Sequence, residues 1–244
     1  MKAVIDLSIP KGWHELPDRE LRFVYQLLQG EYSLPKIKTL CLLRWGHLKV
    51  VRREGAVFIV RLQKQTFPLS ALQISEAVQH LDWLGDFPLN PVRLSRIGRH
   101  RPVRADFQNV SFGNFLALDN LYQGFLQTQK PELLRDMAAL MYQAPKIHLS
   151  KVEEISIFYW YTSLKRYIAS MFTHFFRMEQ VSANNPTALS FQQLQQNMNT
   201  QIRALTGGDI TKEKEVLEMD CWRALTELEA KAIDYEELQK TTNS

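Results

Sequence analysis

The chain contains 244 residues, of which 45% are hydrophobic, and its formal net charge is +4. This length and composition are enough for one large or two small domains with a buried core. No run of about 18 uncharged apolar residues occurs, and Asp6 and Pro10 lie where a signal peptide would be apolar. We therefore expect a soluble chain that neither crosses a membrane nor is secreted.

The first 86 residues predict a small α+β unit. Apolar residues recur with helical spacing in residues 17–30 and 35–45. Residues 48–62 are rich in β-branched residues on both sides of Gly55, and residues 66–69 add a third short strand. Ser70 and Gln73 then form a capping box that opens a helix ending near Gly85. We expect two helices, an antiparallel hairpin or meander, and a further helix.

Residues 87–106 predict a basic connector that is rich in Pro and Arg, because proline removes backbone donors and fixes φ. Beyond it the helical period returns. The pattern predicts a helical domain over residues 107–180, with helices at 111–128, 131–143 and 150–177.

Residues 181–244 predict a linker followed by an acidic helical hairpin. From Asp209 onward the sequence contains ten acidic and five basic residues. The second arm of the hairpin is therefore acidic, and the rest of the chain is basic. The fold class we expect is α+β and mostly helical, in which a small N-terminal α/β-meander unit precedes a helical bundle and a C-terminal helical hairpin.

Five arginines in the connector form the first candidate binding site. Guanidinium groups are always charged and suit phosphates, so the cluster is a candidate for nucleic acid or an acidic partner. The alternatives are a solvated connector, or arginines that pair with the acidic arm of the same or a neighbouring subunit. The five residues are Arg93, Arg96, Arg99, Arg101 and Arg104.

A second candidate surface is an apolar stripe at spacings of three and four in residues 190–205, which carry an uncharged polar back. The stripe suits packing against a partner helix as well as against its own chain. It consists of Phe191, Leu194, Met198, Ile202 and Leu205. The sequence leaves open whether the hairpin packs on its own body.

No pattern for catalysis or metal binding is present in the sequence. The six histidines are scattered, without a pair at i and i+4, and no HExxH, GxSxG, Walker A or GxGxxG motif occurs. We therefore expect no catalytic residues, no metal ligands, no cofactor and no enzymatic activity.

Four stretches resemble uncharacterised proteins that prophages and other mobile elements of gut bacteria carry. They are PDRELRFVYQLL, CLLRWG, DNLYQGFL and IRALTGGDITKEKEVLEMDCWRALTELEAKA. The resemblance implies a structural or assembly protein of a tailed phage, and it transfers no site residues.

On this basis we expect a non-enzymatic phage or prophage protein that acts in tail or virion assembly through protein–protein contacts. Its partners would be other phage or prophage proteins, or further copies of itself, and it would lie in the cytoplasm of the bacterial host or in the virion. The alternative is a nucleic-acid-binding accessory protein that uses the connector arginines.

Overall fold

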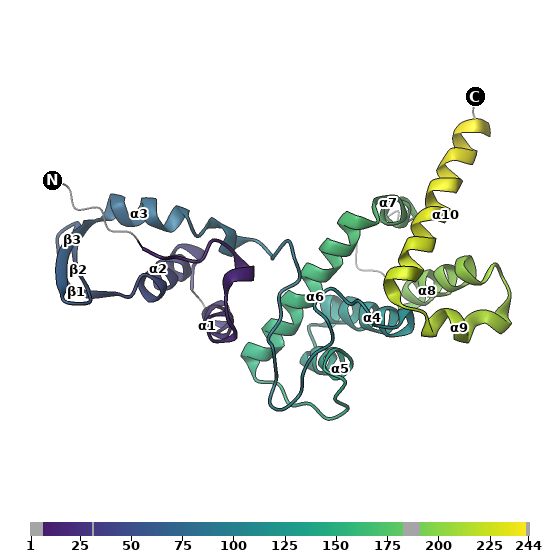
Figure 1. The fold of residues 1–244 in the computed structure, drawn as a ribbon, viewed down its shortest axis with the longest axis horizontal. Coiled ribbons are helices and arrows are strands. Elements are labelled where there is room, and N and C mark those ends of the chain that lie inside the picture. Colours follow the sequence, from purple (N-terminus) through teal and green to yellow (C-terminus); the bar gives the residue numbers. More distant parts are fainter. Residues whose placement is uncertain (1–6, 31, 183–190, 243–244) are drawn as a thin grey trace. The chain divides into compact units, whose positions relative to one another are not determined.

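The computed structural model describes residues 7–30, 32–182 and 191–242. They form an α+β fold that is mostly helical, with one three-stranded antiparallel sheet near the N-terminus and a C-terminal helical hairpin (Figure 1). The predicted fold class is therefore confirmed. Residue contacts group the chain into two compact units, one of Met1–Pro88 with Lys151–Ser156, the other of Leu89–Ser150 with Ile157–Ser244.

These two units differ from the four predicted segments. Most of the connector, most of the helical domain and the C-terminal hairpin fall together in the second unit. The physical reason is a shared core, because all three segments contribute buried side chains, such as Leu94, Trp160 and Leu225.

The first unit begins with three helical elements, the short 3-10 helix η1 (Trp13–Glu15), α1 (Asp18–Gln29) and α2 (Leu34–Trp45). Glu20 of α1 joins the two α-helices. Its carboxylate accepts two hydrogen bonds from the Arg44 guanidinium, at 2.6 and 3.0 Å, and one from Trp45 Nε1 at 2.9 Å. These bonds from a cation and a ring N–H lower the pKa of Glu20, with the Arg44 hydrogen bond as the largest cause.

The sheet of the first unit is a meander of β1 (Leu48–Glu54), β2 (Val57–Leu62) and β3 (Gln65–Ser70). Both pairs are antiparallel, and a bulge interrupts the β1–β2 register between Val50 and Arg52. The predicted capping box at Ser70 and Gln73 is present and opens α3 (Ala71–Gln79). The predicted helix to Gly85 is too long, because α3 ends at Gln79 and a separate 3-10 helix, η2 (Asp82–Gly85), follows.

The second unit begins with the connector and continues as helices around a shared core. The helices before the hairpin are α4 (Phe112–Thr128), α5 (Pro131–Met141), α6 (Lys151–Met171), of which the part from Ile157 belongs to this unit, and α7 (Thr173–Ser182). The C-terminal elements are α8 (Phe191–Thr206), the 3-10 helix η3 (Ile210–Lys212), α9 (Glu213–Glu218) and α10 (Cys221–Thr242). The predicted linker between the helical domain and the hairpin lies largely outside the described residues.

The single long helix predicted over residues 150–177 is wrong, since it breaks at Phe172. In a continuous helix the N–H groups of His174 and Phe175 would bond to carbonyls four residues earlier. Here the Glu229 carboxylate of α10 accepts both, at 3.1 and 2.8 Å. A side chain from a distant helix thus caps α7, which sequence periodicity within α6 and α7 does not reveal.

Within the described residues, no helix has both the length and the apolarity that a membrane crossing requires.

Candidate binding surfaces

The connector is an ordered part of the second unit although its residues 89–106 form no helix or strand. Leu94 and Ile97 are buried in the core, together with Phe107 just after it. Ile97 and His100 exchange backbone hydrogen bonds at 3.1 and 3.0 Å, which closes a small turn around Gly98. Gly98 has a φ of +56°, a conformation that glycine adopts without strain.

Four further hydrogen bonds fix the connector backbone to the helices of its unit. They run from Val103 N to Met141 O (2.8 Å), Tyr142 Oη to Leu94 O (3.1 Å), Trp160 Nε1 to Ala105 O (2.9 Å) and Trp222 Nε1 to Asp106 O (2.6 Å). Backbone groups that lack regular structure need such partners when they are buried. The bonds therefore hold the arginines on a fixed framework rather than on a solvated linker.

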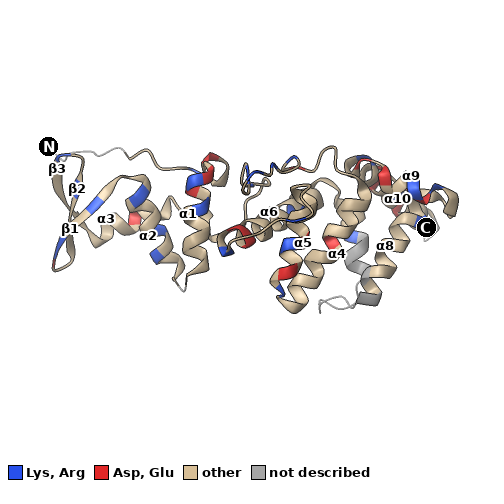
Figure 2. Cartoon of the chain, turned by 90° about the horizontal axis from the view of Figure 1, so that it is seen from below, with Lys and Arg blue, Asp and Glu red and all other residues tan. Residues whose placement is uncertain are grey.

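The five connector arginines differ in their surroundings. The Arg93 guanidinium lies 5.7 Å from the centre of the Trp160 ring and is half-buried. Arg96, Arg99 and Arg101 are exposed. Among the described residues, neither Arg99 nor Arg101 forms an ion pair. Figure 2 shows the basic residues of each part of the chain in blue.

Arg104, by contrast, is paired within the connector. Its guanidinium donates two hydrogen bonds to the Asp106 carboxylate, at 3.2 and 3.1 Å. This interaction lowers the pKa of Asp106 and raises that of Arg104. Arg104 is therefore a weaker candidate for an external anion than Arg99 or Arg101.

Several acids of the C-terminal arm interact with groups other than the connector arginines. Asp220 caps α10, and its other carboxylate oxygen accepts the Asn109 N–H at 2.7 Å. Glu236 pairs with His174 of α7 at 3.1 Å and with Arg177 at 3.8 Å. Asp220, Glu229 and Glu236 therefore stabilise the second unit, to which they themselves belong. For Arg99 and Arg101, the described residues therefore do not support pairing with the arm of the same chain.

The predicted apolar stripe of α8 packs against other helices of its own unit over part of its length. Ile202 is buried, and Met198 and Leu205 are half-buried. The amide of Asn120 in α4 lies 3.6 Å from the Met198 sulfur. The side chains of Phe191 and Leu194 lie outside the described residues. The stripe thus packs at least partly on its own chain.

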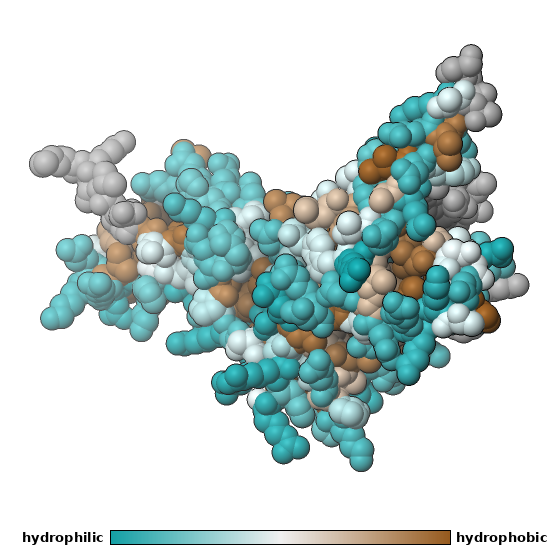
Figure 3. Space-filling view, turned by 45° about the vertical axis from the view of Figure 1, so that its right-hand side comes forward, coloured by the Kyte–Doolittle hydropathy of each residue, from teal (hydrophilic) through white to brown (hydrophobic). Residues whose placement is uncertain are grey.

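The two halves of α10 have different surroundings. Cys221, Ala224, Leu225 and Leu228 in the inner half are buried. In the outer half the exposed fraction is 50% for Tyr235 and 67% for Leu238. Figure 1 shows the last turns extending past the other helices of the unit, and Figure 3 shows brown apolar surface on this arm. We call Tyr235 and Leu238 the α10 tip.

A further basic surface, which the sequence pattern did not indicate, lies on the sheet of the first unit. Lys49 of β1 lies directly opposite Arg61 of β2, and both side chains are exposed. The turn at Gly55 was the signal that could have found this pair, since folding the strands about that turn brings residues 49 and 61 close to the same level. The bulge between Val50 and Arg52 shifts the register by one residue, and this shift sets Lys49 opposite Arg61.

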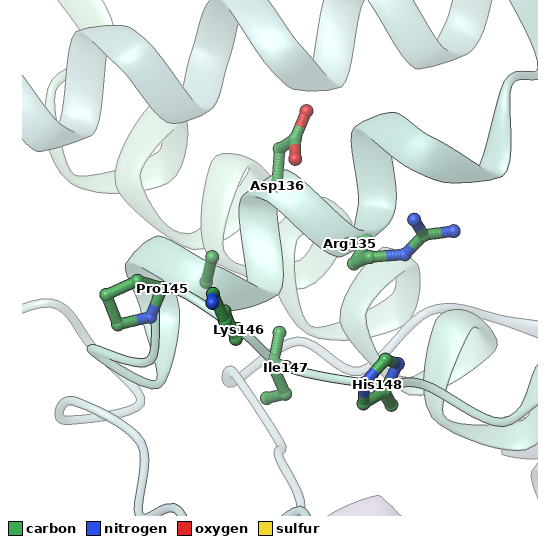
Figure 4. A pocket seen from close by; sticks show the side chains of 7 residues that line it. Arg135, Asp136, Pro145, Lys146, Ile147 and His148 are labelled. Carbon is green, nitrogen blue, oxygen red and sulfur yellow. The ribbon is translucent and has the colours of Figure 1, made fainter.

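Two hollows lie on the surface of the described residues. A cavity of about 250 Å³ lies beside α5 and is lined by Arg135, Asp136, Ala139, Pro145, Lys146, Ile147 and His148 (Figure 4). All of its charged side chains are exposed. A second hollow of about 500 Å³ lies between η3 and α9 and is more open than the first.

The described residues hold neither an exposed cysteine thiol nor a cluster of metal-binding side chains. Cys41 and Cys221 are buried, and desolvation raises the pKa of each thiol to about 12. At neutral pH they remain protonated and poorly nucleophilic. No group of three or more His, Cys, Asp or Glu side chains that could hold a metal ion occurs among the described residues.

No protein-family model, curated protein or solved structure matches this chain.

Proposed function

We propose that this chain is a non-enzymatic phage or prophage protein that acts in tail or virion assembly through protein–protein contacts. The α10 tip carries the proposal. It presents a large aliphatic and an aromatic side chain, at 67% and 50% exposure, on a helix whose inner half is anchored in a core. The resemblance of four sequence stretches to prophage proteins supplies the context, and on that basis we propose the host cytoplasm or the virion as its location.

The physical argument is that contact surfaces combine rigid support with uncovered apolar groups. Cys221, Leu225 and Leu228 fix the base of α10, and Glu229 and Glu236 join it to α7. The tip is therefore held by several anchors although it is exposed. Aromatic side chains such as Tyr235 supply much of the binding energy at protein interfaces, and the apolar area of Leu238 adds to it when it is buried.

Site-specific crosslinking in phage-producing cells tests the proposal. A photo-reactive amino acid replaces Leu238, and the matched control carries it at Leu72 of α3, which is equally exposed at 68%. After nuclease treatment, we expect capsid or tail proteins, or a second copy of this chain, crosslinked from position 238 and not from position 72. Equal labelling from both positions, or none from position 238, would contradict the proposal.

Nucleic-acid binding is a second candidate, favoured by the ordered connector. Arg99 and Arg101 are exposed, and the described residues give neither of them an ion-pair partner. A guanidinium that its own chain does not neutralise is available to a phosphate. The alternative function therefore rests on a fixed surface instead of a mobile linker.

Salt-dependent binding tests this second candidate. Replacing Arg99 and Arg101 with glutamine should reduce the slope of log affinity for duplex DNA against log salt concentration by about two, since each phosphate contact contributes about 0.9. The control replaces Lys212 and Lys214, which lie close to Asp209 and Glu218. An unchanged slope in the connector variant excludes this role.

A further inference from the structure

We propose that the open face of the β1–β3 sheet is a nucleic-acid-binding surface that contacts the phosphate backbone through Lys49, Arg61 and Lys64. This inference goes beyond protein-contact assembly, and it concerns a different unit from the connector arginines. The occupant that fits is a polymer of closely spaced negative charges.

The register of the sheet separates two faces. Leu48, Val60 and Phe67 lie on one face, where Leu48 and Val60 are buried. Lys49, Arg61 and Thr66 lie on the other and are exposed, because neighbouring residues in a strand point to opposite sides. The basic side chains are therefore on the face away from the core.

The sheet region, residues 48–70, is strongly basic. Residues 48–70 contain five basic residues and a single acid, Glu54. Glu54 is already paired with Arg52 at 2.6 Å. Arg53 is held as well, because its Nε donates to the Gly55 carbonyl at 2.8 Å and its guanidinium lies 5.4 Å from the Phe58 ring centre. Three cations remain for an external ligand.

Those three are Lys49, Arg61 and Lys64, all exposed. Throughout the described part of the chain, no carboxylate lies within ion-pair distance of any of them. Lys64 lies in the turn between β2 and β3, next to the end of the strand that carries Arg61. The free charges are thus grouped at one end of the open face.

The pairing of Lys49 with Arg61 works against the stability of the sheet. Side chains that are directly opposite in an antiparallel pair have Cβ atoms about 4.5–5.5 Å apart, and like charges there are destabilising. Basic residues on an edge strand also discourage edge-to-edge pairing, which accounts for Lys49 on β1. Edge protection does not account for Arg61, because β2 is the central strand.

A phosphate backbone matches this arrangement better than an acidic protein segment. Duplex DNA carries one negative charge per about 1.7 Å of helix axis, so a group of cations on its surface meets a high linear density of negative charge. Acidic side chains on one face of an extended peptide are about 6.8 Å apart, twice the rise per residue. The open face carries no aromatic side chain, so contact with the backbone is expected, without base stacking.

The test measures affinity for a duplex DNA of random sequence over a series of salt concentrations, with the full chain. Replacing Lys49 and Arg61 with glutamine should reduce the salt slope by about two, and adding Lys64→Gln should reduce it by about one more. The conservative pair Lys49→Arg and Arg61→Lys should retain the slope. The Lys212 and Lys214 double variant again removes two charges elsewhere.

A single substitution separates binding from folding. Lys49→Glu creates an opposite-charge pair with Arg61, so the melting temperature should stay the same or rise while the affinity for DNA falls. A fall in both would assign Lys49 a structural role and overturn the proposal.

Two other outcomes also contradict the inference. If the slope is unchanged in the sheet variants but falls in the Arg99 and Arg101 variant, the nucleic-acid surface is the connector alone. If DNA binding is unchanged and the sheet variants instead lose binding to an acidic polypeptide such as polyglutamate, the occupant is a protein. Neither outcome bears on crosslinking from position 238, so the assembly proposal is tested separately.

Discussion

The connector and the C-terminal arm each carry an excess of one charge, basic in the connector and acidic in the arm, and they use their charges differently. The connector keeps Arg99 and Arg101 exposed, while its backbone is bound by Trp160 and Trp222. The arm directs Glu229 and Glu236 into its own unit. A run of charge in a sequence therefore does not show whether the charged groups are available to a partner. What decides this is whether the same chain supplies their counterparts.

The largest expected effect distinguishes the two halves of α10. Leu225→Ala should reduce the free energy of unfolding of the second unit by about 2–5 kcal/mol, because Leu225 is fully buried. Leu238→Ala should change it by less than about 0.5 kcal/mol, because its side chain is mostly exposed. Chemical denaturation followed by circular dichroism measures both. Equal losses would show that the tip is also part of the core.

The next effect concerns the bond between the arm and the connector. Trp222→Phe retains an aromatic ring but removes the N–H that donates to Asp106 O at 2.6 Å. We expect the free energy of unfolding to fall by about 1–3 kcal/mol, because the Asp106 carbonyl then lacks that donor. The same denaturation experiment measures it, and Thr226→Val on the exposed side of α10 is the control. A Trp222→Phe variant as stable as the wild type would remove the main link proposed between the two segments.

A smaller effect tests how the arm uses its acids. Glu229→Ala removes the acceptor for the N–H groups of His174 and Phe175. We expect the free energy of unfolding to fall by about 0.5–2 kcal/mol, as for other lost helix caps, and chemical denaturation measures this change. Glu227→Ala, an exposed neighbour on the same helix, should cost less. Similar costs for the two variants would mean that the cap contributes little.

The smallest effect is a pH dependence within the connector. The hydrogen bond from Arg104 lowers the pKa of Asp106. A carboxyl group with a lowered pKa stabilises the folded chain above its unfolded pKa, and this contribution is lost as the pH falls through the folded pKa. The stability difference between the wild type and Asp106→Asn should thus be present at neutral pH and shrink as the pH falls below the usual Asp pKa of about 3.9. Thermal melts over this range measure it, and a difference that grows on acidification would contradict the assignment.

Local sequence signals predicted the elements whose causes lie within a few residues. The capping box at Ser70, the meander around Gly55 and the helix that begins after Ser111 all depend on neighbours in the chain. The break at Phe172 depends on Glu229, which is 57 residues away, so periodicity predicted one continuous helix.

The candidate sites show the same limit. The sequence identified the connector arginines, but the order of the loop depends on Trp160 and Trp222, which come from distant helices. The stripe of α8 was recognised as apolar, and only the tertiary packing placed Ile202 in the core of its own unit. The pair formed by Lys49 and Arg61 required the register of the sheet, which a one-residue bulge shifts.

Amide hydrogen exchange of the full chain tests most directly the claim that the connector is a fixed surface and the α10 tip an exposed one. The amides of Val103 and Phe107 donate to Met141 O at 2.8 Å and Arg104 O at 3.1 Å. They should exchange as slowly as amides in the core helices of the second unit, whereas amides around Leu238 should exchange much faster. Connector amides that exchange at the rate of an unstructured peptide would contradict the account, because the arginines would then lie on a mobile linker.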